Sequence, residues 1–445
     1  MSSSGCNSLV SIVRQCCVRG ISQAHSWRSF SSALAASSSQ WAFLTSRGVL
    51  QAEGPQALEF LQGIVSNDVR PLMGAGPQQA PVYAAILTPK GKFLHDVFIY
   101  PHPELQDAVL LDVDRDGRTA ALQLLNRYKL RRPIKFQDVS ARYSVATCWG
   151  RASPPPGPWW RPDPRLADLG FRALVPAAAA ATLGDAVGAS AAAASEDEYR
   201  ALRYQLGVAE GEVEIPAGQA APLDYNVDVL NGVSYTKGCY VGQERNSFTH
   251  YRGVIRKRLM PVRLEVLGPG DSPASQPAAR QLGSGTDGDT AGPGPSSDSA
   301  AAGTAAAQAV CGAGADVVDA ASGRSVGQLR GAVLAGSGAG PQGRGGAAAW
   351  GIAYLKLDAA LHAAEGRSEL LVAASSGAEA AGSAEELGTT AARTAAAGAE
   401  TGIVGGGAGG LSPGAAVWRV IPVRPTWWPS EWGREEEVAS GGGSR

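Results

Sequence analysis

A short segment from Asn231 to Glu244, NGVSYTKGCYVGQE, holds the residues of this 445-residue chain with the clearest chemical potential. Lys237 and Cys239 flank a single glycine, so an ammonium and a thiol share a short stretch of backbone. A nearby cation lowers the pKa of a thiol and increases its thiolate fraction. We therefore interpret Cys239 as a candidate functional thiol with Lys237 as its activating neighbour. The alternative is an inert, buried cysteine in a glycine-rich turn.

The same segment contains groups suited to binding a flat heterocycle. Gly238 and Gly242 allow the backbone to approach a ligand closely. Gln243 offers an amide, and Glu244 offers a carboxylate that can accept two parallel hydrogen bonds from an amidine-like edge, such as that of a pterin. These residue types make the segment a candidate ligand-binding turn as well as a thiol site.

Net charge and cysteine count exclude several classes of function. The chain has 39 basic and 40 acidic residues, a formal net charge of −1, which argues against broad binding of nucleic-acid phosphates. Only Cys148, Cys239 and Cys311 lie beyond residue 40, so that part of the chain is too poor in cysteine for a self-contained four-cysteine metal site. No apolar run of about 18 residues occurs, and we expect no membrane-spanning helix.

Hydrophobic patterning predicts an α+β unit ahead of this motif. The runs Val82–Leu87 and Phe93–Tyr100 enclose a Pro-Gly turn and indicate a β-hairpin. Arg118–Lys129 has apolar residues at helical spacing. A further helix is expected at Glu196–Leu206, with Gly207 as its carboxyl-terminal cap.

Short strands with long loops predict a small β-barrel at the carboxyl-terminal end. Val254–Val266 is interpreted as a strand pair, or as one bent strand broken at Pro261. Asp316–Arg330 is predicted to form a hairpin. Ala348–Leu357 and Ala416–Pro422 supply further strands.

Composition indicates segments that contribute little to a core. Residues 1–40 have three arginines, many serines and no acidic residue, which is typical of an organelle transit peptide, for the mitochondrial matrix ahead of the chloroplast stroma. Residues 151–195 are interpreted as a Pro/Ala-rich connection. Low complexity predicts disordered insertions in the barrel and a disordered tail, at residues 268–309, 331–349, 374–416 and 433–445.

The string KGCYVGQE, Lys237–Glu244, resembles the signature of the folate-binding YgfZ family of iron–sulfur maturation proteins, relatives of the glycine-cleavage aminomethyltransferase. Ser46–Val69, Tyr83–Tyr100 and Glu198–Pro216 are similar to further segments of that family, and Gly253–Val262 looks like its mitochondrial branch. The resemblance implies a three-domain fold arranged as a ring. Its domains would be an N-terminal folate-binding domain at 41–150, a segment at 196–262 that completes the folate site, and a β-barrel at 263–432.

The resemblance also implies cofactors and partners. Tetrahydrofolate would bind in a central pocket, and A-type iron–sulfur scaffold proteins and apo [4Fe-4S] clients would be the partners, with no nucleic acid involved. Cys239 would act as one ligand of a transient iron–sulfur cluster that partner thiols complete. The family favours an assembly factor over an enzyme. A folate-dependent aminomethyl or one-carbon transferase is the alternative, and a purely structural binding module is a third possibility.

Individual site residues follow from matching the family's motifs. Asp96, in HDVF, is the candidate for contacting the pteridine, and its alternative role is a strand-end turn or cap. Asp224, in DYN, stands where relatives commonly have Glu. Phe248 replaces a usual Arg, so the local anion site is in doubt. The remaining expected cofactor-binding residues lie in the signature: Gly238, Tyr240, Gly242, Gln243 and Glu244.

Overall fold

An antiparallel sheet carries the turn against which the thiol motif packs. The computed structural model describes residues 39–74, 76, 79–188, 191–267, 314–334, 348–373 and 417–429. Helices cover the outer face of this first sheet and bury a core of aliphatic side chains there. The strand order is β3-β4-β5-β2-β6, with β2 (Arg47–Glu53), β3 (Val82–Leu87), β4 (Phe93–Pro101), β5 (Ala108–Asp114) and β6 (Lys135–Asp138), and the helices are α1 (Ala57–Gln62) and α2 (Arg118–Lys129).

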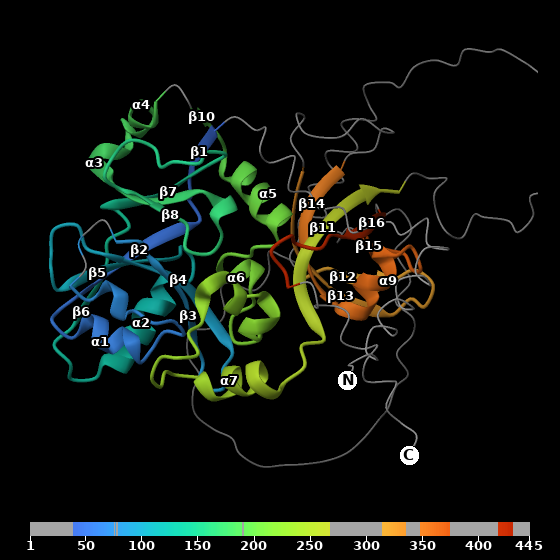
Figure 1. Cartoon of the computed structure of the whole chain (residues 1–445), viewed down its shortest axis with the longest axis horizontal. Coiled ribbons are helices and arrows are strands. Elements are labelled where there is room, and N and C mark those ends of the chain that lie inside the picture. The colour runs from blue at the N-terminus through green and yellow to red at the C-terminus, as the bar shows by residue number, and fades with distance from the viewer. Residues whose placement is uncertain are drawn as a thin grey trace, which may run out of the picture.

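A second five-stranded sheet packs against the inner face of the first (Figure 1). Alternation along β7 explains the two layers, because Val145 and Trp149 point to the first sheet while Ala146 and Cys148 point to the outer face. The strand order is β10-β1-β7-β9-β8, with β1 (Ser39–Phe43), β7 (Tyr143–Trp149), β8 (Trp160–Pro162), β9 (Phe171–Pro176) and β10 (Ala191–Ala193), and the outer helices are α3 (Ala177–Ala180) and α4 (Leu183–Val187).

The prediction of a Pro/Ala-rich connection at residues 151–195 is therefore wrong. This segment supplies β8, β9 and β10, three strands of the second sheet. β8 and β10 have three residues each, and β9 and β10 pair with β7 and β1, which lie outside the segment, so no local hydrophobic period marks them. β1 also begins at Ser39, inside the segment 1–40 that was expected to be a transit peptide.

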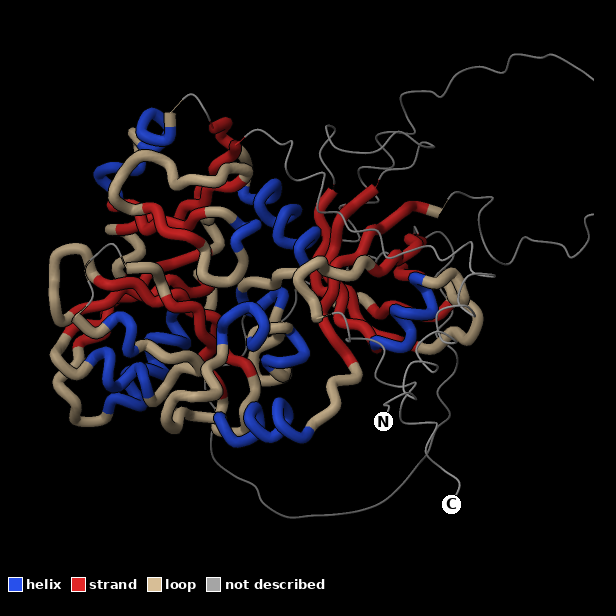
Figure 2. Tube along the Cα trace, in the orientation of Figure 1, coloured by secondary structure: helices blue, strands red, loops and turns tan. Residues whose placement is uncertain are grey.

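Six strands close into a barrel at the carboxyl-terminal end (Figures 1 and 2). Trp418 is fully buried in its core. Helix α9 (Leu357–Ala364) packs on β16 and β14. The order is β11-β14-β13-β12-β15-β16, with β11 (Lys257–Val266), β12 (Asp316–Asp319), β13 (Ser325–Leu334), β14 (Ala348–Lys356), β15 (Leu370–Ala373) and β16 (Val417–Pro422).

Helices and turns connect the sheets to the barrel. Helix α5 (Glu196–Leu206) begins at a capping box on Ser195 and ends at Gly207 in the left-handed conformation, as predicted. It contacts β1 of the second sheet and β13 and β14 of the barrel. The other elements are α6 (Gly211–Glu214), α7 (Gln243–Arg252), 3₁₀ turns at Arg70–Leu72, Ala167–Leu169 and Pro222–Tyr225, and a π turn at Asp228–Gly232.

The structure confirms the α+β class and the carboxyl-terminal barrel, while the ring arrangement stays a prediction. The expected break at Pro261 is absent, and β11 continues through it. The Pro261 carbonyl oxygen accepts a hydrogen bond from Val423 N, so the Pro261 nitrogen faces the β16 side of the strand as well. Pairing with β16 begins only at Val262, and proline has no N–H to donate. No donor is needed at that point of the strand.

Several predicted segments lie outside the described residues. They are the leader up to residue 38, the insertions 268–309 and 374–416, most of the insertion 331–349, and the tail 433–445. The ends of the segment 331–349 belong to strands β13 and β14 instead. No helix in the described part of the chain combines the length and apolar character of a membrane span.

Candidate functional site

Two glycines fit the thiol motif against the β3–β4 hairpin. Gly242, which precedes α7, has a φ of +82°, and a Cβ there would lie 2.5 Å from the Thr88 carbonyl oxygen. A Cβ on Gly91 in the hairpin turn would lie 3.0 Å from the Gly242 carbonyl oxygen. Gly242 therefore serves a close backbone contact within the protein. Gly238 is exposed, and a Cβ added to it would meet no atom within 4 Å.

Lys237 anchors the motif to the loop after α1. Its buried ammonium donates to the carbonyl oxygens of Gln62, Val65 and Asn67 at 2.6, 2.8 and 2.7 Å. These three bonds use every N–H donor of the group, which leaves none for the thiol. Burial lowers the pKa of Lys237 to about 8. Lys237 therefore has a positional role, and its predicted effect on the pKa of the Cys239 thiol stays a prediction.

Cys239 lies exposed on this anchored loop, whereas Cys148 is buried in the second sheet. Cys239 is therefore not the buried cysteine of the alternative interpretation. Among the residues that the structure describes, no three His, Cys, Asp or Glu side chains gather into a metal site. A cluster on Cys239 would need ligands from another molecule.

The other signature residues do not form a shared pocket. Tyr240 is buried, with Lys237 Nζ 5.1 Å from its ring centre. Gln243 and Glu244 occupy the first turn of α7, where Glu244 is exposed. Two cavities lie near the barrel, and none of these residues lines either of them. The signature residues thus lie apart from both cavities, and their expected contacts with a pterin stay a prediction.

The smaller cavity, of about 320 Å³, contains Asp224 and lies between the 216–225 segment and the barrel. Tyr354 of β14 donates its hydroxyl to Asp224 Oδ2 at 2.8 Å and stacks on Tyr225. Lys92 and Arg330 add two cations to the lining. Burial raises the pKa of Asp224, and the Tyr354 hydrogen bond opposes this rise. One predicted residue therefore does line a cavity with charged and aromatic neighbours.

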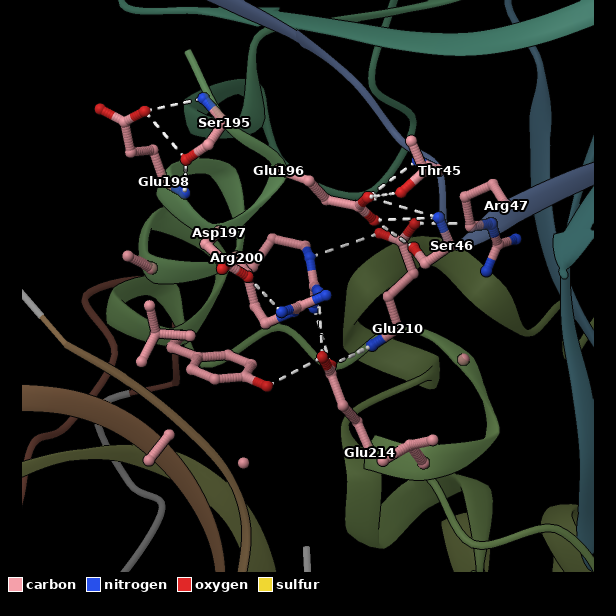
Figure 3. Close-up of a pocket in the computed structure, with 18 of the residues that line it drawn as sticks. Thr45, Ser46, Arg47, Ser195, Glu196, Asp197, Glu198, Arg200, Glu210 and Glu214 are labelled. Carbon is pink, nitrogen blue, oxygen red and sulfur yellow. Dashed lines mark hydrogen bonds and ion pairs between the residues drawn. The ribbon is translucent and has the colours of Figure 1, made fainter. Parts of the chain in front are cut away.

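The larger cavity, of about 1010 Å³, opens between the start of β2, α5, α6 and β13 (Figure 3). Glu196 crosses one side of it and accepts hydrogen bonds from Thr45 and Ser46. Arg203 and Glu214 form a buried ion pair at 2.7 Å on another side. Arg330 lines this cavity as well as the smaller one. The cavity wall is thus a mixture of paired acids and bases.

Asp96 lies between the two sheets and lines neither cavity. It is fully buried in the middle of β4, and both carboxylate oxygens accept from Arg47 Nη1 at 3.0 Å. Burial raises the pKa of Asp96, and the Arg47 guanidinium opposes this rise. Arg47 thus engages both carboxylate oxygens of Asp96, and the contact with a pteridine stays a prediction. The alternative role at a strand end is wrong.

The residue at the centre of this buried charge cluster is Glu210, which the sequence analysis missed. Its two oxygens accept from Arg172 and Arg165 at 2.8 Å. Burial would raise the pKa of Glu210, but four neighbouring guanidiniums hold it well below its usual range. The only local signal was a charged residue inside an apolar strand, as at Arg172 in FRALVP and Asp112 in VLLDVD.

Comparisons with known proteins identify relatives by sequence. No family model matches the chain. It is 36% identical over 258 residues to "Iron-sulfur cluster assembly factor IBA57, mitochondrial" of Mus musculus, a match that covers 52% of this chain and 67% of the mouse protein. It is 37% identical over 244 residues to the IBA57 homologue of Mycosarcoma maydis, covering 52% of this chain and 59% of that protein. The chain thus matches less than two thirds of the fungal relative's length.

A comparison with solved structures aligns one of them with this chain. The glycine cleavage system aminomethyltransferase T from Bartonella henselae aligns with a TM-score of 0.49 at 12% sequence identity, over 76% of this chain and 83% of that one.

Proposed function

The chain belongs to the family of iron–sulfur cluster assembly factors that includes the IBA57 proteins, and from this premise we propose that it matures mitochondrial [4Fe-4S] proteins through Cys239. The observation that carries the proposal is an exposed thiol on a loop fixed by the buried Lys237 ammonium. The relatives are named mitochondrial, which supports a mitochondrial location, and we propose the matrix within it.

A single thiolate cannot satisfy an iron–sulfur cluster, which takes several cysteine ligands. Cys239 therefore supplies one ligand, and thiols of an A-type scaffold protein supply the others. The cluster is cargo on its way to an apo [4Fe-4S] client. An exposed position suits this role because a second protein must bring its own ligands within bonding distance of the sulfur.

Anaerobic cluster reconstitution with a purified A-type scaffold protein tests this role. We expect Cys239→Ser to lose the cluster absorbance that the wild-type pair develops. Cys148→Ser is the matched control, because that thiol is buried and should leave the absorbance unchanged. Activities of aconitase-type and lipoyl-synthase-type clients should fall with Cys239→Ser while [2Fe-2S] proteins stay active. Equal absorbance in the wild type and Cys239→Ser would overturn the role of the thiol.

We also propose that tetrahydrofolate binds in the cavity that contains Asp224. The Asp224 carboxylate suits the aminopyrimidine edge of a pterin, while Arg330 and Lys92 suit the glutamate carboxylates at the other end. A volume of about 320 Å³ falls at the lower end of the range for small-molecule pockets. Arg330 also faces the larger cavity, which leaves room for the rest of the ligand.

A thermal-shift titration with tetrahydrofolate tests this site. Asp224→Ala should abolish the ligand-dependent rise in melting temperature. Gln243→Ala and Glu244→Ala are the controls, because neither residue lines the cavity. A loss of the shift in the controls but not in Asp224→Ala would move the site back to the signature.

The competing transferase activity has its own test. Purified protein is incubated with tetrahydrofolate and an aminomethyl-lipoyl donor, and product formation is measured. We expect no turnover, because Arg47 already engages both carboxylate oxygens of Asp96, the residue expected to contact the pteridine.

A further inference from the structure

Helix α7 has its polar and apolar sides reversed relative to an ordinary surface helix. Its one buried residue is Asn246, 2% exposed. Phe248 and Tyr251, three positions apart and so on one face, are 62% and 66% exposed. Val254, just after the helix, is 67% exposed. Surface helices of globular proteins normally turn their apolar stripe inward.

The side of α7 that faces the protein is polar and poorly satisfied. Within the described residues, Tyr235 Oη and Asp228 Oδ1 are buried without a hydrogen-bond partner. Burying a polar group without a hydrogen-bond partner costs the free energy of removing it from water. Packing within this chain therefore does not explain why the aromatic residues of α7 point outward.

The thiol loop runs along the same helix. Tyr235, before Cys239, stacks on His250 of α7 with ring centres 3.6 Å apart. Tyr240, after Cys239, lies next to the Asn246 side chain. Cys239 is thus held between two contacts with α7, and the exposed aromatic residues belong to the element that supports the thiol.

Cations precede and follow the aromatic residues along the chain. Arg245, Arg252 and Arg256 are exposed, and within the described part of the chain none of the three forms an ion pair. Lys90 is exposed in the hairpin turn whose Gly91 touches Arg245. Glu244 is the one exposed acid on α7. A second copy of this chain would bring the same cations against these, which is unfavourable.

We propose that the outer face of α7, formed by Phe248, Tyr251 and Val254, is the docking surface for an acidic protein partner that brings its cluster thiols to Cys239. This inference rests on the proposed function and names the surface that partner uses. Aromatic side chains anchor such interfaces, and a basic rim steers an acidic partner into register. Phe248, which removes an expected Arg from the signature region, becomes an anchor of the interface.

The test measures binding of a purified, apo A-type scaffold protein to the full chain by isothermal titration calorimetry. We expect the double variant Phe248→Ala/Tyr251→Ala to weaken binding by about tenfold or more. Arg252→Glu should weaken it as well and reduce its dependence on salt. Leu105→Ala is the matched control, since Leu105 is exposed on the β4–β5 connection and should leave the affinity unchanged. Unaltered melting temperatures would show that the variants remain folded.

The outcomes separate this proposal from the proposed function. Cys239→Ser should keep the affinity for the scaffold while losing cluster absorbance, so a failure of the thiol's role leaves docking measurable. Wild-type affinity in Phe248→Ala/Tyr251→Ala would overturn the docking surface and leave the thiol's role intact. Co-sedimentation of the wild type with anionic phosphatidylglycerol vesicles, lost in the double variant while scaffold binding persists, would assign the face to a membrane instead. A wild-type dimer that the double variant abolishes would assign it to a second copy.

Discussion

At the scale of single residues, Lys237 shows how burial changes the meaning of a charge. The sequence places an ammonium beside a thiol, and the natural interpretation is activation. In the fold the same ammonium turns inward and joins the motif to three carbonyl groups. The position of Cys239 therefore depends on Lys237 even though no hydrogen bond joins them.

The lowered pKa of Lys237 predicts a specific dependence of stability on pH. The residue titrates near 8 when folded and near 10.5 when unfolded, because burial disfavours the charged form. Between these values the unfolded chain binds more protons, so the contribution of Lys237 to the free energy of unfolding rises with pH. Urea unfolding between about pH 8 and pH 10 should show a more positive slope for the wild type than for Lys237→Met. Parallel slopes would contradict the shift.

At the scale of elements, the sequence predicts local features well. The hairpin strands, α2, α5 with its Gly207 cap, and the β12–β13 hairpin all follow from spacing and turn residues. Elements defined by distant partners escape it, as β10 does, which pairs with β1. Tyr354 lines the Asp224 cavity from a barrel strand far along the chain, so no motif could have joined the two.

Substitution of the two glycines of the signature should have unequal effects on stability. Gly242→Ala puts a Cβ 2.5 Å from the Thr88 carbonyl oxygen in a left-handed conformation, and it should destabilise the protein by at least about 1–2 kcal/mol. Gly238→Ala meets no atom within 4 Å and should change the free energy of unfolding by less than about 0.5 kcal/mol. Chemical denaturation of both variants measures the difference. A comparable loss in both would show that the motif contacts something beyond the hairpin.

At the scale of the whole molecule, the two sheets meet over a buried charge cluster instead of a purely apolar layer. Arg47 and Asp112 come from the first sheet, Arg172 comes from the second, and Glu210 bonds across to Arg172 and Arg165. Sequence-based reasoning assigns charged residues to the surface, where they usually lie. A cluster assembled from separate segments of the chain is visible only once the chain has folded.

Removing the central charge of this cluster should be costly. Glu210→Gln removes a buried carboxylate that Arg165 and Arg172 share and leaves them only Asp163 and Asp112, so we expect a loss of about 3–5 kcal/mol in the free energy of unfolding. Glu59→Gln is the control, because that exposed carboxylate reaches Arg132 only at 3.9 Å and should be nearly neutral. Urea unfolding at neutral pH compares the two. A loss below about 1 kcal/mol for Glu210→Gln would mean that the cluster rearranges to compensate.

The mutual fit of Gly91 and Gly242 carries a consequence for how this protein can change over time. Each glycine occupies space that a side chain on the other would claim. A lineage that acquires a larger residue in the hairpin tip must also reshape the start of α7, and with it the setting of the sulfur. Because each added Cβ would meet backbone atoms, both positions favour glycine, although about 150 residues of sequence separate them.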